Sequence, residues 1–132
     1  MNREYKIGEV VLVKFYGDGH IQNGIRPAII IQNNIGNRHS PTLQVIPLTS
    51  QVSKKPLPTH VFISAGIGGL QKNSIALCEG QRIINKNNIL KQIGILPDEY
   101  MQAICMGCLI NTPLLIYLSQ QQIIQLHGRL VR

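Results

Sequence analysis

The sequence has 132 residues, 44% of them hydrophobic, a length that suffices for one domain with a core but not for two ordinary domains. Thirteen Lys and Arg residues against six Asp and Glu residues give a net charge of +7, which favours a polyanionic partner, nucleic acid first and an acidic protein segment second. No apolar run approaches the roughly 20 residues that span a bilayer and no apolar leader opens the chain, so we expect a cytoplasmic protein with no membrane contact.

Short β-branched and aromatic runs, separated by Gly, Asn and Pro, fill the first two thirds of the chain and are typical of strands. The expected strands are 9–16, 26–33, 42–49, 59–64, 74–79 and 81–84. A glycine-rich loop is expected over 17–24 and a turn-rich connection over 33–42. Strands this short and this closely spaced predict a small barrel or sandwich.

Helical patterns occur only in the last third of the chain. The segment 85–92 is compatible with one or two helical turns. Pro97, followed by two acidic residues, predicts the beginning of a helix that runs to 110. A second helix is expected over 112–128, with a threonine as its cap and Pro113 in its first position.

The three cysteines are an odd number, which argues against a disulfide framework. Cys105 and Cys108 have redox spacing but lie inside an apolar helical pattern, and we interpret them as two small core residues on one helix face. A structural zinc needs four ligands, and no second close Cys/His pair accompanies them. We therefore expect neither a metal nor a cofactor.

An arginine begins the second expected strand, directly before a proline. If the second and third strands pair antiparallel through the turn at 34–36, Arg26 and Thr49 lie at the same end. A permanently charged guanidinium beside a hydroxyl suits phosphate binding or the stabilisation of a phosphorane. The alternative is a structural ion pair of Arg26 with Glu9 or Glu79. The spacing alone leaves both open.

Four stretches, GEVVLVKF, GIRPAIIIQNNIGNRHSPT, PLTSQ and LPTHVFI, resemble the MazF/PemK family of bacterial toxins in their order and spacing. IGILPDEYM is similar to the entry of that family's C-terminal helix, so the resemblance covers about residues 7–110. It implies a mainly β fold, an SH3-like small β-barrel of the PemK/CcdB kind over 1–111 with a C-terminal helix. Residues 112–132 then form an extra C-terminal extension, which we expect to be helical and packed on the domain or on a dimer partner because it is strongly aliphatic.

The same resemblance implies the activity. Members are homodimeric, metal-independent endoribonucleases that cleave single-stranded RNA at short sequences and leave 2′,3′-cyclic phosphate and 5′-hydroxyl ends. An acidic, MazE-like antitoxin neutralises them. Carried over residue by residue, the catalytic arginine is Arg26 in GIRP and the catalytic threonine is Thr49 in PLTSQ. The family's loop carboxylate is missing here, and His20 is the substitute with a suitable pKa for a general base.

Further polar residues are candidates for RNA contacts, with ordinary surface polarity as the alternative. They are Gln22, Asn23, Arg38, His39, Ser50, Gln51, Lys54, Lys55 and Arg82. Tyr16 and Phe62 are expected in the barrel, and His60 is expected to be a structural histidine with its hydrogen bonds satisfied.

Two other functions remain to be considered. A gyrase poison of the CcdB type shares the fold but uses a tryptophan-containing C-terminal motif, whereas this chain has no tryptophan. A catalytically inactive, RNA-binding relative is kept open by the missing loop carboxylate.

Overall fold

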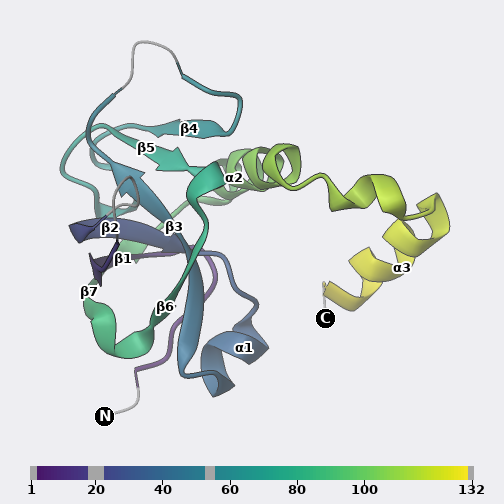
Figure 1. Ribbon diagram of the computed structural model, residues 1–132, viewed down its shortest axis with the longest axis horizontal. Coiled ribbons are helices and arrows are strands. Elements are labelled where there is room, and N and C mark those ends of the chain that lie inside the picture. Colours follow the sequence, from purple (N-terminus) through teal and green to yellow (C-terminus); the bar gives the residue numbers. More distant parts are fainter. Residues whose placement is uncertain (1–2, 18–22, 53–55, 131–132) are drawn as a thin grey trace.

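The computed structural model describes residues 3–17, 23–52 and 56–130, and within them the fold is mainly β with C-terminal helices, as predicted (Figure 1). The strands are β1 (Glu9–Phe15), β2 (Gly24–Ile30), β3 (Thr42–Thr49), β4 (His60–Ile63), β5 (Ser74–Leu77), β6 (Arg82–Asn85) and β7 (Ile89–Ile95). The α-helices are α1 (Asn34–His39), α2 (Asp98–Asn111) and α3 (Gln120–Leu130). Four short 3₁₀ turns are η1 (Ile67–Gly69), η2 (Cys78–Gly80), η3 (Lys86–Asn88) and η4 (Leu114–Tyr117).

The strands form one antiparallel sheet in the order β4-β5-β3-β2-β1-β7. β3 pairs with β2 along one side. Along its other side β3 pairs first with β6 and then, at Leu48 and Thr49, with β5. No ladder joins β4 to β7 among the described strands. Instead η1 packs on β7, so closely that a Cβ at Gly69 or Gly94 would collide with the facing backbone. The sheet is therefore not closed into a hydrogen-bonded barrel, and only packing covers the gap.

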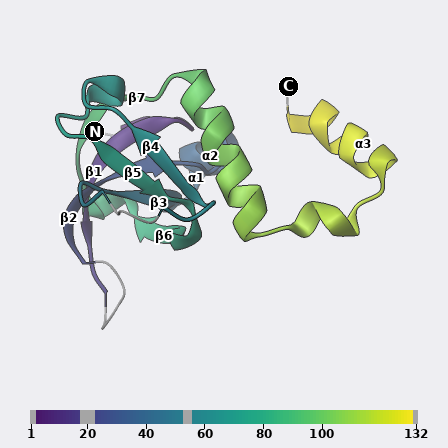
Figure 2. The same ribbon diagram turned by 90° about the horizontal axis from the view of Figure 1, so that it is seen from above.

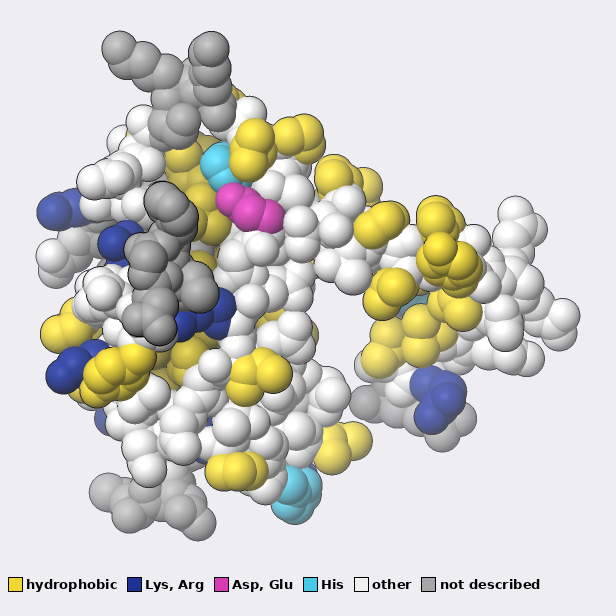
Figure 3. All heavy atoms as spheres, viewed as in Figure 1, with side chains coloured by type: hydrophobic (Ala, Val, Ile, Leu, Met, Phe, Trp, Pro, Cys, Tyr) yellow, Lys and Arg dark blue, Asp and Glu magenta, His cyan; other side chains and the backbone are white. Residues whose placement is uncertain are grey.

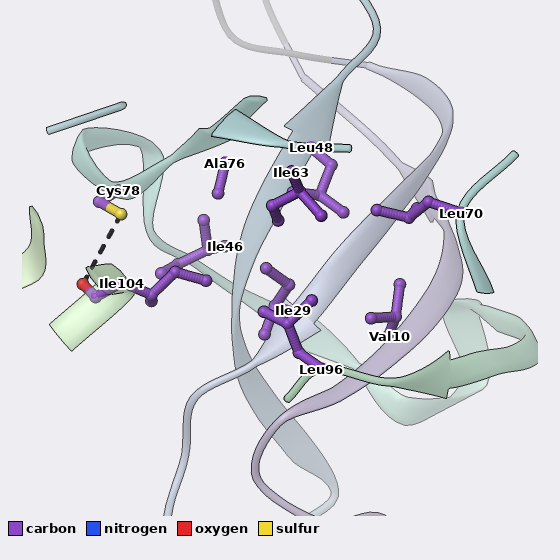
Figure 4. Packing of buried hydrophobic residues seen from close by; sticks show 10 residues of the cluster. All are labelled: Val10, Ile29, Ile46, Leu48, Ile63, Leu70, Ala76, Cys78, Leu96 and Ile104. Carbon is purple, nitrogen blue, oxygen red and sulfur yellow. Dashed lines mark hydrogen bonds between the residues drawn. The ribbon is translucent and has the colours of Figure 1, made fainter. Parts of the chain in front are cut away.

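Side chains of β1, β2 and β3 alternate between two buried clusters, as a pleated strand requires. The helix-side cluster contains Val10, Ile29, Ile46, Leu48, Ile63, Leu70, Ala76, Cys78, Leu96 and Ile104 (Figure 4). The β6-side cluster contains Tyr5, Val11, Val13, Phe15, Ala28, Ile30, Leu43, Val45 and Ile84. Because both faces of the central strands are buried, these strands are a rigid base for whatever projects from their ends.

Two connections differ from the sequence-based expectation. The turn expected over 33–42 contains α1, whose first turn is capped by the Asn33 side chain accepting from the Gly36 N–H at 2.8 Å. The helical turns expected over 85–92 are the 3₁₀ turn η3 followed by β7. β7 is an edge strand whose Lys91 and Gln92 are both exposed, so the alternation that marks a strand is weak there.

The C-terminal helices begin where local capping allows. α2 starts after Pro97, as predicted, and buries Ile104 and Gly107. The expected second helix is interrupted, and α3 starts only after Ser119. There the Ser119 hydroxyl accepts from the Gln122 N–H at 3.1 Å while the Gln122 side chain accepts from the Ser119 N–H at 2.9 Å. This reciprocal capping box is an S-x-x-Q signal in the sequence.

The segment 112–130, which we call the C-terminal arm, stands away from the sheet in both ribbon views (Figures 1 and 2). Its apolar side chains are largely open to solvent; Ile116 is 74% and Ile124 is 71% exposed. The structure does not place the arm on its own domain, and packing on a second subunit stays a prediction. No helix in the described part of the chain has the length and apolar content needed to cross a membrane.

Candidate functional site

Arg26 and Thr49 lie at the same end of the sheet. The ladder between β2 and β3 pairs Ala28 with Pro47, and continuing its register by two residues sets Arg26 opposite Thr49. Opposed residues of an antiparallel pair project from the same face, so the two side chains share the β6-side face. Both are half-buried, and both line one cleft. The β2–β3 register therefore brings the guanidinium and the hydroxyl together.

The guanidinium of Arg26 has no carboxylate partner in the described part of the chain. Its Nε donates to the Asn23 carbonyl at 3.3 Å. Glu9 is buried and accepts hydrogen bonds from the Lys6 N–H and from a side-chain amide. Glu79 is engaged elsewhere as well. The ion pairs that the described residues form join other partners, so the structural alternative for Arg26 is wrong. Its remaining N–H groups are available to an external anion.

Glu79 belongs to a separate hydrogen-bonded group. Its carboxylate accepts from Thr59 Oγ1 at 2.8 Å and from His60 Nε2 at 3.0 Å. The Leu57 N–H donates to His60 Nδ1 at 3.2 Å, which places the proton of the neutral ring on Nε2. Partial burial raises the pKa of Glu79, but hydrogen bonds from its own backbone N–H, His60 and Thr59 outweigh this and lower that pKa. His60 therefore has structural hydrogen bonds, consistent with the sequence-based interpretation.

Thr49 is the last residue of β3, and its hydroxyl oxygen accepts one hydrogen bond. Its Oγ1 accepts from the Gln51 N–H at 3.1 Å, which orients the oxygen and leaves the hydroxyl hydrogen free to donate. Ser50 also lines the cleft, whereas Gln51 is exposed beside it. A hydroxyl that is fixed by a backbone N–H and can still donate is suited to holding a phosphate oxygen.

Arg82 lies on the same face as Arg26. It pairs with Val45 of β3, and its guanidinium carbon lies 4.9 Å from the centroid of the Phe15 ring. It also donates to the Tyr16 carbonyl, at the end of β1. Arg82 thus contributes a second guanidinium to the face from which Arg26 projects, held in place by its own contacts.

The cleft has a volume of about 700 Å³. Its lining combines apolar, amide and hydroxyl side chains with the cations Arg26, Lys72 and Lys91, and no carboxylate is among the lining residues that the structure describes. Sequence reasoning missed Lys72 and Lys91. They are distant from Arg26 along the chain, and Lys91 was assigned to a helical segment. Only the topology, in which β7 pairs with β1 and η1 packs on β7, brings them to the cleft that Arg26 lines.

The other predicted contact residues divide into three groups. Asn23 lines the cleft. Arg38 and His39 lie on α1, which connects the opposite ends of β2 and β3, and Arg38 is 3.7 Å from Glu4. Those that lie outside the described residues are His20, Gln22, Lys54 and Lys55.

The two aromatic residues expected in the barrel have exposed rings. Phe62 lies on β4 and is 51% exposed, and Tyr16 follows β1 and is 63% exposed. Cys105, expected to be a core residue, is exposed too, so that interpretation was wrong for it, whereas Cys108 is half-buried against Cys78. Phe62 alternates with the buried Ile63 and so points to the outer side of β4, whereas Tyr16 lies one residue beyond the end of β1. On the face shown in Figure 3, the acidic side chains in view form one patch beside a histidine, and most of the Lys and Arg side chains in view lie over the sheet.

A small, basic antiparallel sheet whose strand ends bring an arginine and a hydroxyl together in one cleft belongs to the class of compact β proteins with a site suited to an anion. The family model described as PemK-like, MazF-like toxin of type II toxin–antitoxin system matches residues 6–109. The chain belongs to that family.

Curated relatives and solved structures agree with this assignment. Endoribonuclease EndoA of Bacillus subtilis strain 168 is 44% identical over 86 residues, 65% of this chain and 74% of the relative. Endoribonuclease MazF of Staphylococcus saprophyticus is 40% identical over 86 residues, 65% of this chain and 72% of the relative. MazF from Deinococcus radiodurans superposes with a TM-score of 0.72 at 22% identity, covering 83% of this chain and 96% of that one. A mycobacterial endoribonuclease in complex with its cognate antitoxin gives 0.68 at 20% identity, with coverages of 83% and 96%. These two structures confirm the fold.

Proposed function

We propose that this chain is the toxin of a type II toxin–antitoxin system and cleaves single-stranded RNA. Its relatives EndoA and MazF are both named endoribonucleases, at 44% and 40% identity. The observation that carries the proposal is the meeting of Arg26 and Thr49 at one end of β2 and β3, with no carboxylate of the described residues paired to Arg26.

The proposed reaction is a transesterification within the RNA. The ribose 2′-hydroxyl attacks the adjacent phosphorus in line, the bond from phosphorus to the 5′-oxygen breaks, and the products are a 2′,3′-cyclic phosphate and a 5′-hydroxyl. Arg26 neutralises the equatorial oxygens and passes a proton to the leaving 5′-oxygen. Thr49 donates its hydroxyl hydrogen to a non-bridging oxygen. These steps use groups of the protein and the RNA alone, so the cleavage is metal-independent.

A base must take the proton of the 2′-hydroxyl. A guanidinium is poorly suited, because it holds its proton too tightly to accept a second role as a base. We assign this role to His20, in the loop between β1 and β2, which lies outside the described residues. If His20→Ala leaves the rate of cleavage and its pH profile unchanged, another group is the base.

The proposed partners follow from charge and family. The net charge of +7 supports attraction of RNA and of an acidic, MazE-like antitoxin. Solved neighbours of this fold include toxins in complex with their antitoxins, which supports a protein partner of this kind. We further propose that the chain forms a homodimer and acts in the cytoplasm, where its RNA substrate is found.

Incubation with a long single-stranded RNA in EDTA, with mapping of the new 5′-hydroxyl ends, tests the proposal. The wild type is expected to cleave at defined short sequences. Arg26→Ala should lower the cleavage rate at least ~100-fold, because the charge that opposes the phosphorane is lost. Arg3→Ala, which removes the same charge from the exposed segment before β1 and away from the cleft, is the matched control and should retain the rate. A wild-type protein that leaves RNA intact would overturn the proposal and favour the gyrase poison or the inactive relative.

A further inference from the structure

The cleft extends well beyond Arg26 and Thr49. Leu12, Ile25 and Leu48 line it from the helix-side face of the strands, whereas Arg26 and Thr49 belong to the β6-side face. The lining therefore includes both sides of the strand ends. The cleft continues from Arg26 and Thr49, around the end of β2, towards η1 and β7.

Two lysines stand in this extension. Lys72 follows η1, and Lys91 lies on β7 opposite Leu12 of β1. Both are exposed, and neither ammonium group forms a hydrogen bond or an ion pair with any residue that the structure describes. Folding does not use these charges. Two unpaired cations in a concave surface raise the local concentration of an anion.

The remaining lining residues within the described part of the chain offer hydrogen bonds and carry no negative charge. Amides and hydroxyls come from Asn23, Ser50, Gln71, Ser74 and Gln92. Gln92 contacts Glu9, but that carboxylate is buried, accepts from Gln92 and the Lys6 N–H, and is not part of the lining. Amides and hydroxyls next to cations can read the edges of unpaired bases while phosphates meet the cations.

Resting on the proposed function, we propose that this extension is an RNA subsite, in which Lys72 and Lys91 bind phosphates of the strand next to the cleaved bond. RNA enters along η1 and β7 and passes around the end of β2 to Arg26 and Thr49. Lys72 and Lys91 are positioning residues, which hold the strand without taking part in the bond changes. An acidic peptide would meet the same cations, but it would bring no phosphodiester to Arg26 and Thr49, which line the same cleft. RNA is therefore the occupant that the lining favours.

The salt dependence of binding tests the subsite. The probe is a fluorescein-labelled, mixed-sequence, single-stranded 2′-O-methyl RNA, which lacks the attacking hydroxyl and so binds without being cleaved. Fluorescence anisotropy gives Kd from 50 to 300 mM KCl. Each phosphate contact to a single strand contributes about 0.7 to the slope of log Kd against log salt. Lys72→Gln/Lys91→Gln should lower that slope by about 1.4 and weaken binding.

A second double variant separates a local effect from net charge. Arg3→Gln/Lys6→Gln removes the same number of charges from the exposed segment before β1 and should leave the slope within about 0.3 of wild type, less than half of one contact. If both double variants lower the slope equally, only net charge matters and the subsite is refuted. In the cleavage assay the Lys72/Lys91 variant should raise KM severalfold with kcat unchanged, because the contact acts before and during reaction alike.

The outcomes distinguish this inference from the proposed function. Cleavage by the wild type together with an unchanged slope and KM in the Lys72/Lys91 variant overturns the subsite alone. A wild type that cleaves nothing while the variant loses the expected slope overturns the nuclease and supports the subsite. An unchanged slope together with weakened binding of a poly-glutamate peptide assigns the extension to an acidic protein partner and overturns the RNA subsite.

Discussion

At the scale of single residues, Glu79 and Arg26 differ in whether their charge has a partner within the fold. Glu79 is held by Thr59 and His60, so its charge is used within the fold. Arg26 bonds through Nε to the Asn23 carbonyl, and no other described residue bonds its outer nitrogens. Pro27, which has no N–H, can follow it because the ladder between β2 and β3 begins only at Ala28. A charge that the fold does not neutralise is available for a ligand.

The Glu79 group predicts an acid-dependent loss of stability. The pKa of Glu79 is lower in the folded state than in the unfolded state, where it is about 4.3. The carboxylate therefore stabilises the folded protein above the unfolded pKa, and this stabilisation is lost as pH falls through the folded pKa. Glu79→Gln should cost about 1 kcal/mol at pH 7, a modest value because the side chain is 34% exposed. Urea unfolding at pH 7 and pH 3.5 measures it. The deficit should shrink at pH 3.5; an equal deficit at both values would show that ionisation of Glu79 is irrelevant.

Residues were predictable from the sequence where the information was local. Arg26 and Thr49 stand in short motifs on neighbouring strands, and one assumed pairing sufficed to place them at the same end. Lys72 and Lys91 have no such motif. Each is a lysine in a polar surface segment, and their meeting depends on the packing of η1 against β7, which only the three-dimensional fold provides.

At the scale of elements, capping residues and strand pairing set where helices and strands begin and end more than the periodicity of hydrophobic residues does. The start of α2 was predictable because Pro97 and two acidic residues mark it. β7 was not, because an edge strand gains its structure from pairing with β1, a long-range contact. α1 was read as a turn because its signal is six residues long and polar. Short elements of this kind depend on tertiary contacts, such as the Asn37 side chain donating to the Gln32 carbonyl at 2.8 Å.

The contact of α2 with η2 predicts an unusual sign for a helical glycine. Gly→Ala inside a helix normally stabilises by about 1 kcal/mol. At Gly107, however, a Cβ would lie 2.8 Å from Cys78 Sγ and 3.2 Å from the Thr59 carbonyl oxygen. Gly107→Ala should therefore destabilise by about 1–3 kcal/mol. Gly128→Ala in α3, where no atom lies within 4 Å, is the control and should be neutral or stabilising.

Denaturant unfolding of both glycine variants measures the difference. Cys78→Ala removes the sulfur atom that the new methyl group contacts. Gly107→Ala should therefore cost less free energy of unfolding in the Cys78→Ala variant than in the wild type. If Gly107→Ala stabilises the protein as Gly128→Ala does, α2 can move away from η2 and does not pack as closely as the structure shows.

At the scale of the whole molecule, charge and apolar surface are separated. The barrel carries most of the basic residues, whereas Thr112 to Leu130 contains one arginine and no carboxylate. The arm and the outer side of α2 expose many large apolar side chains, among them Met106, Leu114, Ile116, Tyr117, Ile124 and Leu130. A monomer rarely leaves so much apolar surface in contiguous segments uncovered. We infer that a second copy of the chain, and not an acidic antitoxin, covers the arm, because the arm offers almost no charge to attract an acidic partner.

Removal of residues 112–132 tests this assignment. Because the arm lies outside both buried clusters, the shortened domain should fold with nearly unchanged stability. Its self-association constant should fall at least tenfold, about 1.4 kcal/mol, because the apolar side chains of the arm no longer leave water. Sedimentation equilibrium over a range of concentrations measures this. Ile116→Gln/Ile124→Gln in the full chain should reproduce the weakening, whereas Gln121→Ala should not. Equal association by the full and shortened chains would instead confine subunit contacts to the barrel.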